Sequence, residues 1–156
     1  MPDLKIRDCV EEDIPGILEI ENASFDDPYP QSLFLAFRRR FPRGFRVAES
    51  EGQIVGYCII SPWKNKQTMI ITSLAVRPEF KRSKIATNLL KDALLLAKVS
   101  PTAMSILLQV AVDNIAAITL YEKFGFVHSR LIKNYYGKNR DGIQMELVLK
   151  REEPGN

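Results

Sequence analysis

The sequence predicts a mixed α/β fold, a central sheet of about seven strands flanked by about four helices. Three observations predict it. The chain has 156 residues, 46% of them apolar, which suits one buried core. Short β-branched runs alternate with helical periods in the order β-α-α-β-β-β-α-β-α-β-β. The middle of the chain shows strand, helix, strand and helix in succession, which is typical of an α/β sheet.

Each element follows from a local pattern. Alternating or β-branched runs predict strands over residues 4–7, 45–49, 54–61, 68–76, 105–112, 126–134 and 143–149. The run 105–112 is largely apolar, which suits a buried strand. Helical periodicity predicts helices over residues 13–24, 33–41, 83–98 and 114–124. No repeat or linker interrupts them, so residues 1–156 are predicted to form a single domain with a frayed tail from about residue 150.

Composition excludes several classes of protein. The net charge of +3 is too small to predict nucleic-acid binding, and it suits an anionic small ligand at least as well. No run approaches the roughly 20 apolar residues of a membrane span, and the N-terminus shows no signal peptide. Cys9 and Cys58 stand far apart without histidine partners, so we expect no metal site, two buried thiols and a cytoplasmic location.

The most specific segment joins the fourth predicted strand to the third predicted helix. The start of a helix presents unpaired backbone N–H groups and a partial positive charge, which together bind phosphate oxygens. Lys81, Arg82 and Lys84 add positive charge at that point. A strand, a basic turn and a helix in this order predict a binding site for a diphosphate.

This segment resembles the [QR]-x-x-G-x-[GA] signature of the GNAT acetyltransferases, with Lys81 first, Ala86 last and Lys84 in place of the glycine. Downstream, residues 113–126 resemble the second GNAT pattern, N-x-x-A-x-x-[LF]-Y-x-x-x-G-F, from Asn114 to Phe126. The resemblance covers residues 4–149. It implies acetyl-CoA as the cofactor and the GNAT fold, a mixed, twisted sheet with a splay between its two middle strands.

The resemblance also implies individual roles. The backbone of Leu74, Ala75 and Val76 would pair with the pantetheine arm, and the Asn114 side chain would bond the same arm. Tyr121 would be the general acid that protonates the leaving thiolate. The other predicted cofactor contacts are Lys81, Arg82, Ser83, Lys84, Ile85, Ala86 and Thr87. For Tyr121 the alternative from the residues alone is a tyrosine that packs the last helix.

Two segments resemble the RimI-like protein N-terminal acetyltransferases. Tyr135 and Tyr136 resemble the tyrosine pair that lines the peptide groove of those enzymes, and the alternative is a solvent-facing aromatic hairpin. The loop from Ala23 to Pro30 resembles the pocket for the first substrate side chain, with Phe25, Asp26 and Tyr29 as contacts. The alternative for this loop is a proline-rich turn with capping aspartates.

The general base is the least determined residue. RimI-like enzymes often carry Glu or His on the strand before the second motif, where this chain has Gln109. Because the amide of Gln109 accepts no proton at neutral pH, we expect either Asp27 or a water held by backbone groups and Gln109 to act as the base. Gln109 is also a predicted substrate contact. The substrate is expected to be a protein or peptide N-terminus.

Other functions remain open at this point. The run from Arg38 to Arg43 is either a solvated helix end or a contact for a ribosome or an auxiliary subunit. An acetyltransferase for lysine side chains or small amines is one alternative function. A cofactor-binding or partner-binding module that has kept the fold is another, and Lys84 and Gln109 are its best arguments.

Overall fold

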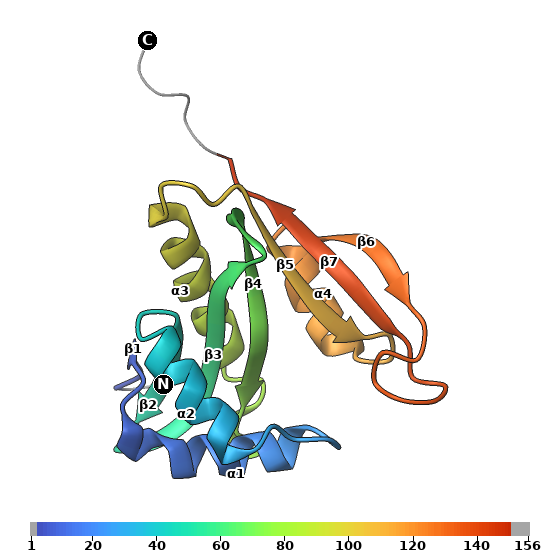
Figure 1. The fold of residues 1–156 in the computed structure, drawn as a ribbon. Helices are drawn as coiled ribbons and strands as arrows, with labels where there is room; N and C mark the ends of the chain where they lie inside the picture. Colours follow the sequence, from blue (N-terminus) through green and yellow to red (C-terminus); the bar gives the residue numbers. More distant parts are fainter. Residues whose placement is uncertain (1–2, 151–156) are drawn as a thin grey trace. The chain divides into compact units, whose positions relative to one another are not determined.

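The computed structural model describes residues 3–150, and the predicted tail lies largely outside this range (Figure 1). The predicted order of elements is confirmed, and no predicted end is displaced by more than three residues. The helices are α1 (Ile14–Ser24), α2 (Gln31–Arg40), α3 (Ile85–Val99) and α4 (Ile115–Lys123). The strands are β1 (Lys5–Asp8), β2 (Phe45–Ser50), β3 (Gln53–Trp63), β4 (Asn65–Val76), β5 (Ser105–Ala111), β6 (Val127–Ile132) and β7 (Gly142–Val148). Two 3-10 turns, η1 (Glu11–Asp13) and η2 (Pro78–Phe80), precede α1 and α3.

The strands form one mixed sheet in the order β1-β2-β3-β4-β5-β7-β6, which confirms the predicted fold class. The β4–β5 pairing is parallel, from Thr68 opposite Ser105 to Ile71 opposite Leu108. This register ends at Ile71, whereas β4 continues to Val76 and β5 to Ala111. A register that stops before both strands end is what the predicted splay requires.

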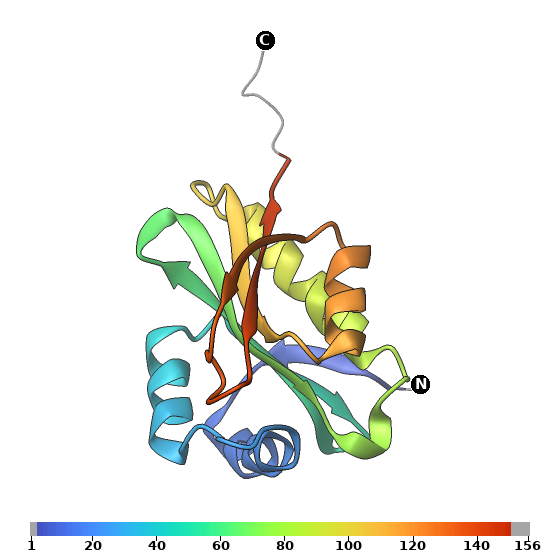
Figure 2. The same cartoon turned by 90° about the vertical axis from the view of Figure 1, so that its right-hand side faces the viewer.

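The chain divides into two compact units, one formed by Met1–Ser61 with Thr72–Leu96 and the other by Pro62–Ile71 with Ala97–Asn156. In the first unit, α1 and α2 lie on one side of the sheet and α3 lies on the other (Figure 2). Ile14, Ile17 and Ile20 of α1 pack with Phe34, Phe45 and Tyr57 in the buried core. Gly56 of β3 faces α3, because an added Cβ would lie 3.0 Å from Leu89 Cδ1. The prediction of a single domain stays a prediction.

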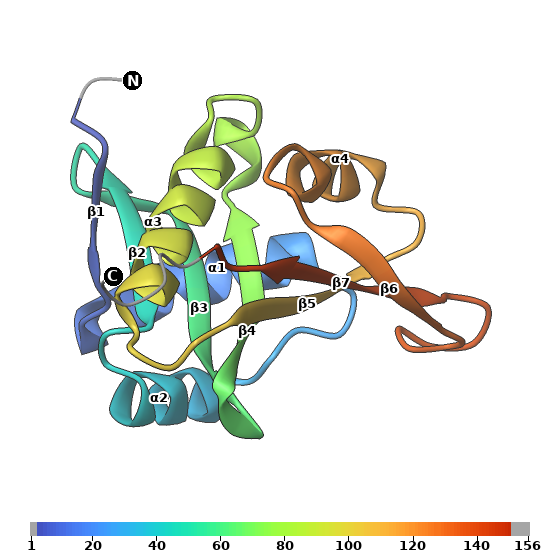
Figure 3. The same ribbon diagram turned by 90° about the horizontal axis from the view of Figure 1, so that it is seen from above.

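In the second unit, β7 pairs antiparallel with both β5 and β6 (Figure 3). The expectation of a buried strand holds for one face of β5, where Ile106, Leu108 and Val110 are buried. The other face, with Ser105, Leu107, Gln109 and Ala111, is half polar and only partly covered. Within residues 3–150, no helix is long and apolar enough to cross a membrane.

A partly buried ion pair between β1 and the residue before α1 gives a first prediction. Arg7 Nη1 and Nη2 donate hydrogen bonds of 2.8 and 2.9 Å to the two carboxylate oxygens of Asp13. The backbone N–H of Val10 donates a third, 2.8 Å long. Burial opposes ionisation of Asp13, but Arg7 and the Val10 N–H outweigh it and lower the pKa of Asp13 below its ordinary value.

We therefore expect Asp13→Asn to lower the free energy of unfolding by about 3 kcal/mol at pH 7. Because the folded pKa lies below the unfolded one, this contribution is present above about pH 4 and is lost as pH falls through the folded pKa. Urea unfolding at pH 7 and pH 3 measures it, with exposed Glu12→Gln as the control. An equal loss at both pH values would contradict this explanation.

Candidate active site

The predicted phosphate-binding turn is held in the first unit by Arg77, which follows β4. Arg77 is 9% exposed. Its Nε donates to Ile54 O at 2.9 Å, and its Nη1 donates to Glu19 Oε2 at 2.8 Å. Its backbone N–H donates to Val55 O at 2.7 Å. The turn therefore starts from a point that is fastened to both β3 and α1.

The turn itself has the backbone of an anion site. Arg82 and Lys84 both adopt left-handed conformations, with φ of 69° and 67°. Asn88 N–H donates to Lys84 O at 3.0 Å, the first turn of α3. The backbone N–H groups of residues 85–87 lie at the start of the helix, where no carbonyl group of the same helix accepts their hydrogen bonds. This arrangement, with positive side chains beside it, fits a diphosphate.

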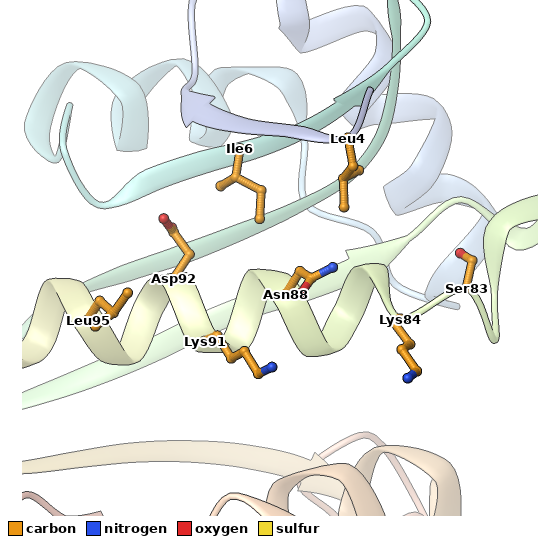
Figure 4. Close-up of a pocket in the computed structure, with 8 residues that line it drawn as sticks. All are labelled: Leu4, Ile6, Ser83, Lys84, Asn88, Lys91, Asp92 and Leu95. Atoms are coloured by element: carbon orange, nitrogen blue, oxygen red, sulfur yellow. The ribbon is translucent and has the colours of Figure 1, made fainter. Parts of the chain in front are cut away.

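Lys84 stands at the position where the signature that this segment resembles has glycine. The structure gives it the left-handed region, and its side chain is exposed. Lys84 lines a groove of about 490 Å³ between β1 and α3. Leu4 and Ile6 form the β1 side, while the Lys84 and Lys91 side chains point away from β1 (Figure 4).

Removing the strain at Lys84 should stabilise the protein. A left-handed conformation costs an L-residue about 1–2 kcal/mol, and glycine adds about 0.5 kcal/mol of freedom to the unfolded chain. Lys84→Gly is therefore expected to raise the free energy of unfolding by a net of about 1 kcal/mol. The matched control is Lys81→Gly, three residues earlier and also exposed, where φ is −62°. That change should lower the free energy of unfolding by about 0.5 kcal/mol, because glycine adds freedom to the unfolded chain. Thermal melting measures both, and a loss of stability in Lys84→Gly would contradict the expectation.

In the second unit, the structure places the predicted residues of α4 and β5 in well-defined surroundings. Asn114 caps α4, and its Oδ1 accepts a hydrogen bond from Ala117 N–H at 3.2 Å. Its Nδ2 group carries the donors that the predicted bond to the cofactor arm needs. Tyr121 is 7% exposed, and its ring packs edge-on against Phe126 at a centroid distance of 5.8 Å. Gln109 Nε2 lies 3.4 Å from Gln144 Oε1 on β7.

The tyrosine pair lies in the β6–β7 connection. The rings of Tyr135 and Tyr136 meet edge to face at 4.9 Å, and their exposed fractions are 49% and 38%. Asp141 Oδ1 accepts the N–H of Asn134 at 2.9 Å, and Tyr136 N–H donates to Arg140 O at 3.0 Å. Tyr135 also covers Gly142, where an added Cβ would lie 2.9 Å from Tyr135 Cβ. These contacts hold two exposed phenols at defined positions.

The loop between α1 and α2 carries the other predicted substrate contacts. Tyr29 is partly buried, and its ring packs edge-on against Phe34 and Phe37 at 6.1 and 6.2 Å. Phe25, Asp26 and Asp27 are exposed. The loop therefore has one anchored residue, Tyr29, and three that face solvent.

Sequence reasoning missed three polar residues beneath this loop. Glu21, Tyr57 and Ser73 are buried with exposures of 2%, 0% and 8%. The Tyr57 hydroxyl donates to Glu21 Oε1 and lies 3.1 Å from Ser73 Oγ. Glu21 continues the helical stripe of Ile14, Ile17 and Leu18 at the next expected position. A carboxylate on the apolar face of a helix is the signal that could have found it.

The family model for the Acetyltransferase (GNAT) family matches residues 14–126. The chain belongs to the GNAT acetyltransferase family. It is 31% identical to an N-alpha-acetyltransferase of Sulfolobus acidocaldarius, over 93% of this chain and 92% of that protein. The crystal structure of Ard1 from Thermoplasma volcanium superposes with a TM-score of 0.89 at 28% identity, covering 95% of this chain and 99% of Ard1. The ribosomal-protein-S18-alanine N-acetyltransferase of Escherichia coli shares the fold, with a TM-score of 0.83 at 21% identity over 98% and 99% of the two chains.

These findings confirm the prediction of a GNAT N-acetyltransferase, and the relatives agree with the predicted RimI-like subfamily. They also bear on the turn at Lys84. Lys84 stands at the glycine position of the GNAT signature and adopts a left-handed conformation, with φ of 67°. The roles of the individual site residues stay predictions.

Proposed function

We propose that this GNAT enzyme transfers the acetyl group of acetyl-CoA to the free α-amine of protein or peptide N-termini. The observation that carries the proposal is the turn before α3, whose left-handed residues and free helix start suit a diphosphate. Its relative from S. acidocaldarius, matched over nearly its full length, is named for acetylation of α-amines.

The residues of the first unit would hold the cofactor. The backbone of Leu74, Ala75 and Val76 would pair with its extended arm, and the N–H groups and basic side chains of residues 81–87 would bind its diphosphate. When bound, acetyl-CoA supplies an acyl group activated as a thioester. The backbone N–H of Val76 would stabilise the negative charge that develops on the acyl oxygen.

The residues of the second unit would move a proton and hold the arm. Tyr121 would give its phenolic proton to the thiolate as the C–S bond breaks, because a phenol stays protonated at neutral pH. The Nδ2 group of Asn114 would donate a hydrogen bond to the arm.

The peptide would be held by Phe25, Asp26 and Tyr29, with Tyr135 and Tyr136 bonding its backbone and Gln109 as a polar contact. An α-ammonium has an ordinary pKa of about 8, so part of it is already neutral at cytosolic pH. A weak base therefore suffices, and Asp27 would take the amine proton through water. Asp27 is exposed, and it lies in the loop that would hold the first substrate residue.

Location and partners complete the proposal. We place the enzyme in the cytosol, since Cys9 and Cys58 are both buried free thiols, as is usual in a reducing compartment. The run from Arg38 to Arg43 would contact a ribosome or an auxiliary subunit. Arg39, Arg40 and Arg43 are exposed, whereas Arg38 lies 3.8 Å from Glu11.

The test is the rate of coenzyme A release with matched substrates. One lysine-containing peptide is offered with a free α-amine and again with that amine blocked, and spermidine is offered separately. We expect release only with the free α-amine. Release with the blocked peptide or with spermidine would instead support a lysine or small-amine acetyltransferase. A protein that binds no acetyl-CoA by calorimetry at micromolar concentrations would support the non-enzymatic alternative.

A further inference from the structure

Glu21 accepts a hydrogen bond from each end of the α1–α2 loop. Its backbone carbonyl accepts the N–H of Phe25, at the end of α1, at 3.1 Å. Its side-chain Oε2 accepts the N–H of Tyr29 at 2.9 Å. The five residues from Phe25 to Tyr29, which include all four predicted loop residues of the site, are thus fastened at both ends to one residue.

The same carboxylate is joined to the strand that carries the first cofactor motif. Its Oε1 accepts the hydroxyl of Tyr57 on β3, and that hydroxyl lies 3.1 Å from Ser73 Oγ on β4. Ser73 immediately precedes Leu74, the first of the three residues proposed to pair with the cofactor arm. The chain of contacts from Tyr29 to Ser73 lies wholly within the first unit.

Burial makes the loss of these hydrogen bonds costly in free energy. Glu21 and Tyr57 are almost completely buried, so a carboxylate without donors there would be strongly unfavourable. Burial and the adjacent Glu21 carboxylate raise the pKa of Tyr57 far above its ordinary value, so its phenol keeps its proton and donates. The loop thus has a single favoured position, in which Glu21 receives both of its donors.

We propose that Glu21 is a positioning residue for the peptide, which sets the Phe25–Tyr29 loop relative to the cofactor strand. The inference rests on the proposed function of that loop. Glu21 touches no substrate in this account. It acts through Tyr29 N–H on one side and through Tyr57 and Ser73 on the other, so its loss should affect peptide binding before it affects acetyl-CoA.

Kinetics of three variants test the proposal. Glu21→Ala is expected to raise the peptide KM about tenfold or more, because the loop loses the anchor at Tyr29, while the acetyl-CoA Kd stays within twofold. Glu21→Gln should restore most of the peptide KM. Its amide oxygen accepts Tyr29 N–H, and its amide nitrogen donates to Tyr57, whose hydroxyl then donates to Ser73. Exposed Asn22→Ala, one residue along α1, is the control.

A readout without substrate keeps the proposal separate from the proposed function. Hydrogen exchange of the Tyr29 amide should accelerate at least tenfold in Glu21→Ala and stay near wild type in Glu21→Gln. If Glu21→Ala does not fold, Tyr57→Phe keeps the ring in place and removes only the hydroxyl, with a smaller rise in peptide KM expected. Unchanged Tyr29 exchange and peptide KM would overturn the proposal, as would an equal loss of acetyl-CoA and peptide binding. If the wild type acetylates no peptide but Tyr29 exchange changes in the variants as expected, the proposed function is contradicted. The structural role of Glu21 in holding Tyr29 is then still supported.

Discussion

Tyr121→Phe is expected to lower kcat for peptide acetylation by about 100- to 1,000-fold, while the acetyl-CoA Kd and the melting temperature stay close to wild type. The change removes only the phenolic hydroxyl, so the edge-on contact of the ring with Phe126 persists. The leaving thiolate would then have to take its proton from water. Steady-state rates with saturating peptide measure the effect.

The outcome separates a catalytic tyrosine from a packing one. If Tyr121 only packs α4, the phenylalanine variant should keep kcat within about twofold, and it should lose stability only slightly. A large fall in kcat together with a weaker acetyl-CoA Kd would instead make Tyr121 a binding residue, which would contradict its role as general acid. The thermal melt of the variant shows that the protein remains folded.

Gly44→Ala is expected to lower the free energy of unfolding by about 4 kcal/mol, an exceptionally large effect for one methyl group. An added Cβ would lie 1.9 Å from Ile60 O, a backbone atom that cannot swing away. Relief would require β2 and β3 to separate, which would break the 2.9 Å hydrogen bond from Ile60 N–H to Gly44 O. Phe45, fully buried in the core beside Tyr57, would have to move as well.

Gly52→Ala is the matched control for this prediction. Gly52 lies in the turn between the same two strands, and a Cβ there would meet no atom within 4 Å. Its φ of 78° still disfavours alanine, so a loss of about 1 kcal/mol is expected from the backbone alone. Urea unfolding compares the two variants. Similar losses in both would show that the close approach at Ile60 is not the cause.

Residue patterns predicted most of the fold because most elements carry a local signal. The helical period of residues 83–98 depends on neighbours in sequence, and α3 appears within two residues of those bounds. The closeness of Gly44 to Ile60 depends on strand register across 16 residues, so no local pattern reveals it. The partial cover of β5 on its second face is likewise a matter of packing between elements.

Some residues of the candidate site could likewise be predicted from local sequence, and others could not. The basic turn and Asn114 follow from motif spacing, and the structure shows each at a helix start. Glu21 was hidden because the helical stripe around it predicts an apolar residue. Its partners Tyr57 and Ser73 lie on different strands, 36 and 52 residues further along the chain, so only the folded chain brings them together. The left-handed conformation of Lys84 could not be predicted, because lysine has no preference for positive φ.

The most direct test of the central claim is the position of the acetyl group in one product. A peptide with both a free α-amine and a lysine is incubated with the enzyme and acetyl-CoA, and fragmentation by mass spectrometry locates the modified nitrogen. The proposed function predicts that the acetyl group is on the α-nitrogen and that the lysine is unmodified. Acetyl groups on the lysine ε-nitrogen alone would contradict it.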